Sequence, residues 1–333
     1  MDLIKTLAPG FSVATITGLA ALFLSEHYGA PAMLFALLLG IALSFLYEET
    51  QCKAGIDFTA THILRVGIAL LGLRIVFSDL SALGWQTALM LIVAVSSTIG
   101  VGMLTAKYLK LRSSLGLLTG GAVGICGASA AMAISAILPP SHEKERDTLV
   151  TIVGVTAFST LAMVLYPFIA GLLNLDEVTT GIFIGATIHD VAQVVGAGYS
   201  VSEQTGDVAT LTKLIRVALL MPVIMCILVY IKIRLRSAKN PDTVSRTAPG
   251  IPGFLIAFTL LMIINSLVTL PPVINQSANE LSRLALVLAI TAIGMKSNLK
   301  QLLTVGLKPF CLLAIETSWV AGFILCSLWF LKS

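Results

Sequence analysis

Three polar side chains stand close together in a stretch of sequence that is otherwise apolar enough to cross a membrane. His189, Asp190 and Gln193 lie inside the run from Gly185 to Gly198. An ionisable side chain at membrane depth is costly unless it is paired or hydrated, so such residues mark candidate functional sites. An imidazole beside a carboxylate titrates near neutral pH, and we expect His189 and Asp190 to carry a coupling ion. The alternative is an intrahelical pair whose partners only satisfy each other.

A second stretch is unusually rich in glycine. Four glycines fall within the eight residues from Gly120 to Gly127, and each lowers helix propensity by about 1 kcal/mol relative to alanine. Irregular backbone at membrane depth survives only against protein or a water-filled cavity. The amides of a helix that restarts after such a break carry partial positive charge, so we expect them to hold an oxyanion. Close packing of helices through small residues is the alternative. The candidate binding residues are Gln193 and, from this stretch, Gly120, Gly121, Gly124, Cys126, Gly127 and Ser129.

Four further charged residues fall in or near apolar segments. Lys213 and Arg216 open the segment after the His189 stretch, where they would attract an anion, pair with Asp190 or snorkel to the interface. Arg65 would gate the site or neutralise charge, with snorkelling at a helix end as the alternative. Glu316, inside the last apolar segment, would pair with a base or carry a proton.

Several chemistries lack their motifs in this chain. The sequence has no G-x-x-x-x-G-K-[ST] loop for ATP, no H-E-x-x-H helix and no G-x-S-x-G elbow. The four histidines are scattered, and the five cysteines show no paired spacing, so neither a metal site nor a disulfide framework is expected. We therefore expect no enzyme activity and no cofactor, apart from a coupling ion that would be H⁺ or Na⁺.

The elements that position these residues are membrane helices. Hydrophobic residues make up 57% of the 333 positions and charged residues only 11%, whereas a soluble domain carries about 25% charged residues. Unbroken apolar runs such as Ala88–Val101 exclude the alternating pattern of an outer-membrane barrel. The net charge of +4 resides in short loops, above all between Lys232 and Lys239. These positions favour anionic lipid headgroups as partners and exclude nucleic acid.

Hydropathy predicts a single all-α polytopic transporter domain over residues 1–333, with about eleven transmembrane segments. The segments are expected near Leu7–Leu24, Pro31–Tyr47, Phe58–Phe77, Leu83–Ala106, Ser114–Leu138, Leu149–Leu173, Val178–Tyr199, Leu211–Ile231, Gly253–Leu270, Leu281–Met295 and Leu302–Leu331. The segments 114–138 and 178–199 carry the two unusual stretches. Whether these two segments span fully or re-enter is left open. The Lys and Arg asymmetry of the loops predicts a cytoplasmic N-terminus in a bacterial inner membrane.

A similarity between two parts of the sequence predicts an inverted repeat. Residues 62–84 match residues 284–306 in five Leu, Ile and Gly positions, and Arg74 falls opposite Lys296 in the same register. The segments concerned are seven spans apart, so the copies would run in opposite directions, as in many secondary transporters. The two polar stretches are only two spans apart, which makes them parallel as plain spans. A re-entrant element or a shuffled repeat order would resolve this conflict.

The sequence resembles the YeiH-type bacterial family of sulfate exporters over most of its length. The resemblance is carried by L-R-V-G-I-A-L-L-G-L-R (Leu64–Arg74), G-G-A-V-G-I-C-G-A-S-A-A (Gly120–Ala131), I-H-D-V-A-Q-V-V-G-A-G (Ile188–Gly198) and A-I-G-M-K-S-N-L (Ala292–Leu299). It implies two broken helices that cross near the membrane centre, with a core domain moving against a panel domain. It maps Gly120–Ser129, His189, Asp190 and Gln193 to the crossing.

These observations favour an ion-coupled secondary transporter that exports a small anion, such as sulfate or another oxidised sulfur compound. A channel-like anion pore is the first alternative, although no repeated filter motif is visible. A membrane-embedded enzyme that uses His189, Asp190 and Cys126 is the second. The identity of the anion, the coupling ion, the direction of flux and homo-oligomer formation are left open.

Overall fold

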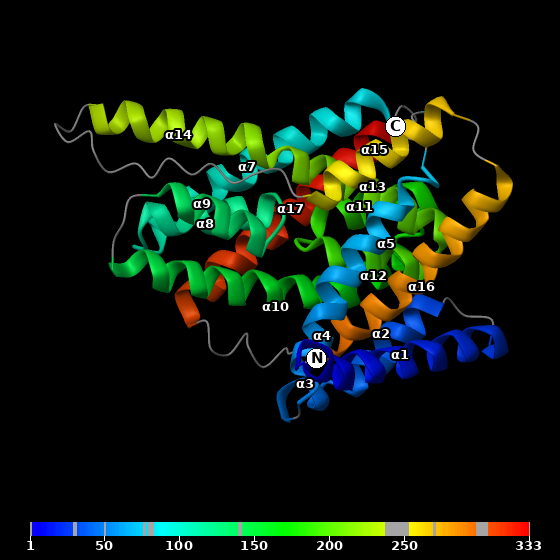
Figure 1. Cartoon of the computed structure of the whole chain (residues 1–333). Helices are drawn as coiled ribbons and strands as arrows, with labels where there is room; N and C mark the ends of the chain where they lie inside the picture. Colours follow the sequence, from blue (N-terminus) through cyan, green and yellow to red (C-terminus); the bar gives the residue numbers. More distant parts are fainter. Residues whose placement is uncertain are drawn as a thin grey trace.

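The computed structural model describes residues 2–28, 32–49, 51–75, 78, 83–138, 142–236, 253–268, 271–297 and 306–332. This part of the chain is built of α-helices joined by turns, with one π-helical turn and no strand (Figure 1). Parts of the expected repeat (residues 298–305) and of the basic loop (residues 237–246) lie outside the described residues.

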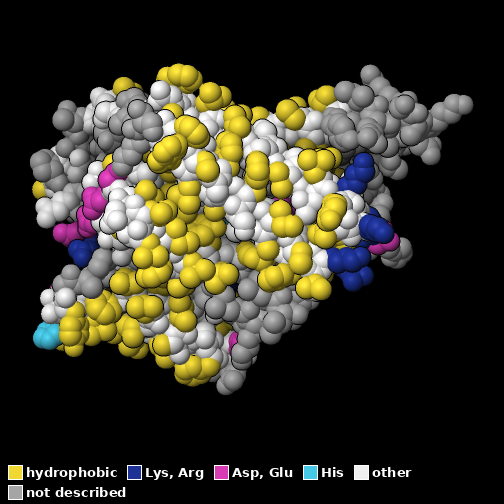
Figure 2. All heavy atoms as spheres, turned by 180° about the vertical axis from the view of Figure 1, so that it is seen from behind, with side chains coloured by type: hydrophobic (Ala, Val, Ile, Leu, Met, Phe, Trp, Pro, Cys, Tyr) yellow, Lys and Arg dark blue, Asp and Glu magenta, His cyan; other side chains and the backbone are white. Residues whose placement is uncertain are grey.

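Membrane-spanning length and apolar composition recur along the chain. Seven helices in the described part are long and apolar enough to cross a membrane: Lys5–Tyr28, Lys53–Leu71, Gly84–Tyr108, Glu143–Leu172, Glu203–Val229, Val273–Lys296 and Leu307–Leu331. Shorter apolar helices cover Ala32–Ala42, Ala128–Ile137, Val191–Val201 and Gly253–Leu267. Apolar side chains cover the middle of one face, and charged side chains gather toward its two ends (Figure 2). The chain is therefore a multi-pass membrane protein; the count of eleven segments stays a prediction.

A first set of helices, here called the α16 group, packs around the helix of that name. It consists of α1 (Asp2–Tyr28), α2 (Ala32–Ala42), α3 (Phe45–Glu49), α4 (Lys53–Phe58), the π-helical turn η1 (Thr59–Ile63), α5 (Leu64–Leu71), α15 (Gly253–Leu267) and α16 (Pro272–Lys296). Glycines allow the backbones to touch: a Cβ added to Gly294 would lie 2.9 Å from the Cα of Gly40 in α2. Such close contact is how helices associate where lipid competes equally for apolar side chains.

A second set, here called the α13 group, holds both unusual stretches. It consists of α7 (Gly84–Tyr108), α8 (Ser113–Gly124), α9 (Ala128–Ile137), α10 (His142–Leu172), α11 (Glu177–Thr187), α12 (Val191–Val201), α13 (Glu203–Ala218) and α17 (Leu307–Lys332). Helix α14 (Leu220–Arg236) continues from α13 and packs on α9. In Figure 1 it extends along one side of the molecule.

The most extensive contacts between the two groups run along one helix, α12. It packs on α2 and on α16. A Cβ added to Gly196 of α12 would lie 3.8 Å from Ile290 of α16, an ordinary van der Waals distance, so the two groups pack directly on each other there. This seam separates two cavities, one toward each end of α12.

Candidate functional site

The glycine-rich stretch interrupts its helix. Helix α8 ends at Gly124 and α9 begins at Ala128. Gly127, which precedes α9, has φ +66° and ψ −128°, a conformation that a residue with a Cβ adopts only at a cost. Its N–H donates to the carbonyl of Ala122 at 2.8 Å, which closes the turn. A local run of glycine therefore produces the break that its composition predicts.

The His189 stretch is interrupted as well. Helix α11 ends at Thr187, and α12 begins at Val191. Asp190 caps α12, because its Oδ1 accepts a hydrogen bond from the amide of Ala192 at 2.8 Å. An aspartate at this position satisfies an amide that would otherwise lack a partner. The ion-coupling candidate thus also has a local structural role.

The two breaks lie against each other in the interior. A Cβ added to Gly127 would lie 3.6 Å from the carbonyl of His189. Lys213 of α13 joins both breaks, since its Nζ donates to the carbonyls of Ile125 at 2.7 Å and Ile188 at 2.9 Å. Its side chain is fully buried, with 0% exposure. A lysine that snorkels to the interface would be exposed at its tip, so that interpretation is wrong for Lys213.

Arg216, one turn further along α13, contacts the carbonyl ends of the same two helices. From α8 it binds the carbonyls of Val123 (Nη2, 2.8 Å) and Gly124 (Nη2, 2.6 Å; Nε, 3.0 Å). From α11 and its end it binds those of Gly185 (3.3 Å) and Ile188 (3.2 Å) through Nη1. The last carbonyls of a helix have no intrahelical donor and carry partial negative charge. With 1% exposure, Arg216 supplies both the donors and the opposite charge.

These contacts give the two cations a structural role, which differs from pairing with Asp190 and from snorkelling to the interface. Lys213 and Arg216 bind main-chain carbonyls, and no ion pair joins either to Asp190 among the described residues. Composition alone points to the amides of the glycine stretch, whereas the engaged groups are its carbonyls. The cations therefore hold the two breaks together from one side.

Asp190 and Gln193 face a polar cavity of about 330 Å³, here called the Asp190 cavity. It lies between α10 and α12 on one side and the α16 group on the other. Gln193 Nε2 donates to Thr160 Oγ1 at 2.8 Å, while its buried Oε1 has no hydrogen-bond partner in the described part of the chain. The remaining lining residues are Tyr47, Ala60, Thr61, Ile152, Val153, Thr156, Ala192, Ile293, Lys296 and Ser297.

The α16 group contributes a cation to this cavity. Lys296 Nζ lies 2.7 Å from Asp57 Oδ1, and the hydroxyl of Tyr47 donates to the same oxygen at 3.2 Å. The phenol of Tyr47 and the ammonium of Lys296 therefore both contact the Asp57 carboxylate. Composition did not identify Tyr47 or Thr160; only the repeat register drew attention to Lys296.

His189 and Glu316 connect the breaks to the last helix. His189 is fully buried, and its Nε2 lies 3.0 Å from Thr317 Oγ1 of α17. The neighbouring Glu316 is also fully buried; its Oε1 accepts from Thr119 Oγ1 of α8 at 2.7 Å. Two adjacent residues of α17 thus touch both broken segments. None of the ion pairs of the described residues involves Glu316, so the pairing considered for it is not formed there.

Some predicted residues do not reach the cavity. Gly120 packs on α7, where an added Cβ would lie 2.9 Å from the Cα of Ile99, and Gly121 faces Ile134 of α9. These contacts are the close packing considered as the alternative. Ser129 is exposed, Cys126 is 4% exposed, and neither lines any of the described cavities. Arg65 is likewise exposed and lines none of them.

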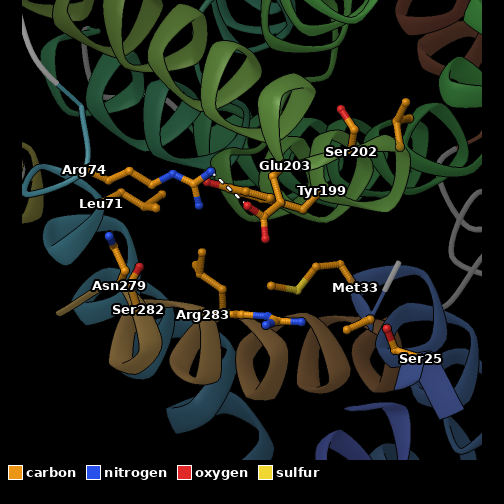
Figure 3. A pocket seen from close by; sticks show the side chains of 13 residues that line it. Ser25, Met33, Leu71, Arg74, Tyr199, Ser202, Glu203, Asn279, Ser282 and Arg283 are labelled. Carbon is orange, nitrogen blue, oxygen red and sulfur yellow. Dashed lines mark hydrogen bonds and ion pairs between the residues drawn. The ribbon is translucent and has the colours of Figure 1, made fainter. Parts of the chain in front are cut away.

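A second polar cavity of about 400 Å³, here called the Arg74 cavity, lies at the other end of α12 (Figure 3). Arg74, just after α5, reaches across to α13. Its Nη2 lies 3.0 Å from Glu203 Oε2, and its Nε lies 3.0 Å from Asp207 Oδ2. Arg283 of α16 lines the same cavity. Arg74 and Lys296, which the expected repeat aligns, therefore belong to different cavities.

Comparison with known proteins identifies close relatives along almost the whole chain. The family model described as "Conserved hypothetical protein 698" matches residues 9–313. The UPF0324 membrane protein RB0971 of Rhizobium meliloti is 48% identical over 329 residues, which cover 98% of this chain and 94% of the relative. UPF0324 membrane protein CT0845 of Chlorobaculum tepidum is 48% identical over 96% of this chain and 88% of its own length.

A third relative is similar over almost the whole length of both chains. The UPF0324 membrane protein TauZ of Paracoccus pantotrophus is 46% identical over 327 residues, with 98% of this chain and 96% of the relative covered. No solved structure matches the chain.

Proposed function

This chain belongs to the UPF0324 membrane protein family, and we propose that it is an ion-coupled secondary transporter that exports a small anion by alternating access. The substrate class is sulfate or another oxidised sulfur compound. One observation carries the proposal. Two helix breaks meet in the interior with Lys213 and Arg216 on their carbonyl ends, beside a polar cavity between two helix groups.

Discontinuous helices at membrane depth support transport because their freed backbone groups need partners. In secondary transporters such breaks form the site for substrate and coupling ion near the membrane centre. Here two buried cations engage five carbonyls at the ends of the interrupted helices: those of Val123, Gly124, Ile125, Gly185 and Ile188. The breaks are therefore held as a rigid unit, and binding is left to the cavity beside them.

The cavity offers groups suited to an anion and to a coupling ion. Lys296 supplies positive charge from the α16 group, and Gln193 supplies a polar amide from the α13 group. We assign Asp190, at the edge of the cavity, to the coupling ion, with H⁺ and Na⁺ as the two candidates. The adjacent His189, whose buried side chain contacts Thr317, belongs to the same proposed ion-coupling site.

The positions of the two cavities support alternating access. The Asp190 cavity and the Arg74 cavity lie toward opposite ends of α12, and the contact of Gly196 with Ile290 lies between them. Movement of one helix group along this seam would expose a bound anion to each side in turn. We place the chain in a bacterial inner membrane with its N-terminus in the cytoplasm, and we propose that it performs no chemical conversion.

Flux through purified protein in proteoliposomes tests the function. We expect saturable uptake of [³⁵S]sulfate that depends on a proton or sodium gradient, and a several-fold higher half-saturating concentration in Gln193→Leu. Arg146→Gln, an exposed change at the start of α10, is the matched control. Unsaturable conduction would instead support a channel, and conversion of the anion without flux would support an enzyme. Absence of flux for sulfate, sulfite, thiosulfate and organic sulfonates would contradict the proposal.

A further inference from the structure

The Arg74 cavity contains an ion-pair bridge between the two helix groups. Arg74 follows α5 of the α16 group, whereas Glu203 and Asp207 belong to α13. Tyr199 of α12 donates to Asp207 Oδ1 at 2.5 Å, which fixes the inner carboxylate. The bridge crosses the seam along which the groups would have to move. It therefore joins the two groups at this end of α12.

The two carboxylates of the bridge differ in accessibility. The side chain of Glu203 is 65% exposed, and that of Asp207 is 22% exposed. An exposed ion pair is worth little, so a dissolved anion competes effectively with Glu203 for the guanidinium of Arg74. Asp207, held by Tyr199, is the more firmly placed partner.

A second guanidinium lies across the cavity. In Figure 3, Arg283 extends from α16 on the side opposite Arg74, and Glu203 projects into the space between them. Arg283 forms no ion pair with any described residue. Planar guanidinium groups match the oxygens of carboxylates and of tetrahedral oxyanions. Ser202, Asn279 and Ser282 add polar groups to the wall.

We propose that the Arg74 cavity is a second oxyanion site, at which a tetrahedral anion replaces the Glu203 carboxylate between Arg74 and Arg283 and so reduces the bridge between the helix groups to the ion pair of Arg74 with Asp207. Without the anion, the Glu203 carboxylate occupies the anion position and both ion pairs join the groups. With the anion, the link from Arg74 to α13 is weakened, and the groups separate there more readily. This inference rests on the proposed two-sided transport. It adds that the ion-pair bridge restrains movement of the helix groups when no anion is bound.

Thiol labelling tests the proposal without measuring transport. Single cysteines replace Ala32, which lines the Arg74 cavity and is 7% exposed, and Thr61, which lines the Asp190 cavity, in a background without the five native cysteines. Sulfate is the probe, with gluconate at equal ionic strength as the reference. We expect sulfate to raise the labelling rate of Ala32→Cys at least threefold and to lower that of Thr61→Cys.

Charge variants then separate the bridge from the anion site. Arg74→Gln should give the open labelling pattern without sulfate. Glu203→Gln should shift the pattern the same way and lower the sulfate concentration for the half-maximal effect several-fold. Arg283→Gln should keep the closed pattern and lose the sulfate response, whereas Arg146→Gln should behave as the parent.

The outcomes separate this site from the transport function. An unchanged sulfate response in Arg283→Gln, or an unchanged pattern in Arg74→Gln, would overturn the second site. If flux persists in proteoliposomes in either case, the proposed function stands without it. If the labelling response is present but no flux is measured, the anion site stands and the transport function fails.

Discussion

The guanidinium of Arg216 donates two hydrogen bonds to the carbonyl of Gly124, at 2.6 Å from Nη2 and 3.0 Å from Nε. The same side chain reaches the carbonyl of Ile188, so one residue joins the ends of two interrupted helices. A cation that is 1% exposed at membrane depth is tolerated because each of its hydrogen bonds to the described residues is to a carbonyl oxygen of opposite partial charge.

Loss of Arg216 should therefore destabilise the fold. We expect Arg216→Met to lower the free energy of unfolding by about 3 kcal/mol or more, since several buried carbonyls lose a charged donor. The free energy of unfolding of Arg216→Lys should fall between those of Arg216→Met and the parent, because lysine keeps the positive charge but lacks the planar set of N–H donors of a guanidinium. Thermal unfolding in detergent measures both, with exposed Arg146→Gln as the control. Equal stability of Arg216→Met and the parent would contradict the capping role.

Two substitutions at Asp190 should separate its two roles. Asn caps a helix about as well as Asp, so Asp190→Asn should keep the melting temperature while removing the dependence of flux on pH or sodium. Asp190→Ala should lose the cap as well, at a cost of about 1 kcal/mol. Flux and thermal unfolding are measured on both. Ion-dependent flux that survives in Asp190→Asn would remove Asp190 from the coupling role.

The turn at Gly127 should resist any side chain. Its φ of +66° and ψ of −128° make Gly127→Ala unfavourable by about 1–3 kcal/mol. Gly124→Ala is the matched change, since Gly124 has ordinary helical φ and an added Cβ would lie 3.4 Å from the nearest atom, the carbonyl oxygen of Val95. Comparison of the two unfolding temperatures checks the prediction, which fails if Gly124→Ala is the less stable variant.

Lys296 should act on anion affinity and little on folding. Its ion pair with Asp57 is partly exposed, with side-chain exposures of 35% and 39%, so its loss should cost less than about 1 kcal/mol. Lys296→Gln should raise the half-saturating anion concentration several-fold, and Lys296→Arg should restore most of the affinity. Concentration-dependent flux measures the series. Equal affinity in Lys296→Gln and the parent would place the anion elsewhere.

The sequence predicts the helix breaks better than it predicts the contacts around them. Clustered glycines and the His189–Asp190 pair are local signals, and both interruptions occur where these signals lie. The roles of Lys213 and Arg216 depend on carbonyls about 90 positions upstream, and no local pattern encodes such a contact. Hydropathy alone allows snorkelling, which the burial of both side chains contradicts, and anion attraction by the two residues stays a prediction.

The residues that line the cavities are harder to predict from the sequence than the helix breaks. Tyr47 and Lys296 are brought beside Gln193 by the packing of α16 and α2 on α12, which hydropathy cannot register. Ser129 shows the opposite case: its proximity in sequence to the glycines made it a candidate, yet helical periodicity turns it outward. The inverted repeat and the count of eleven spans stay predictions.

The capping of helix ends by Lys213 and Arg216 has an evolutionary consequence. Both cations bind main-chain oxygens, which every residue type supplies, so Val123, Ile125 and Ile188 are free to drift among apolar residues. Within the described residues, each hydrogen bond of Arg216 goes to a main-chain carbonyl, so no hydrogen-bonded side chain has to change in step with a substitution at Arg216. We therefore expect Arg216 to be fixed across relatives while giving little covariation signal, so that coevolutionary contact maps would miss the contacts that join the two broken helices.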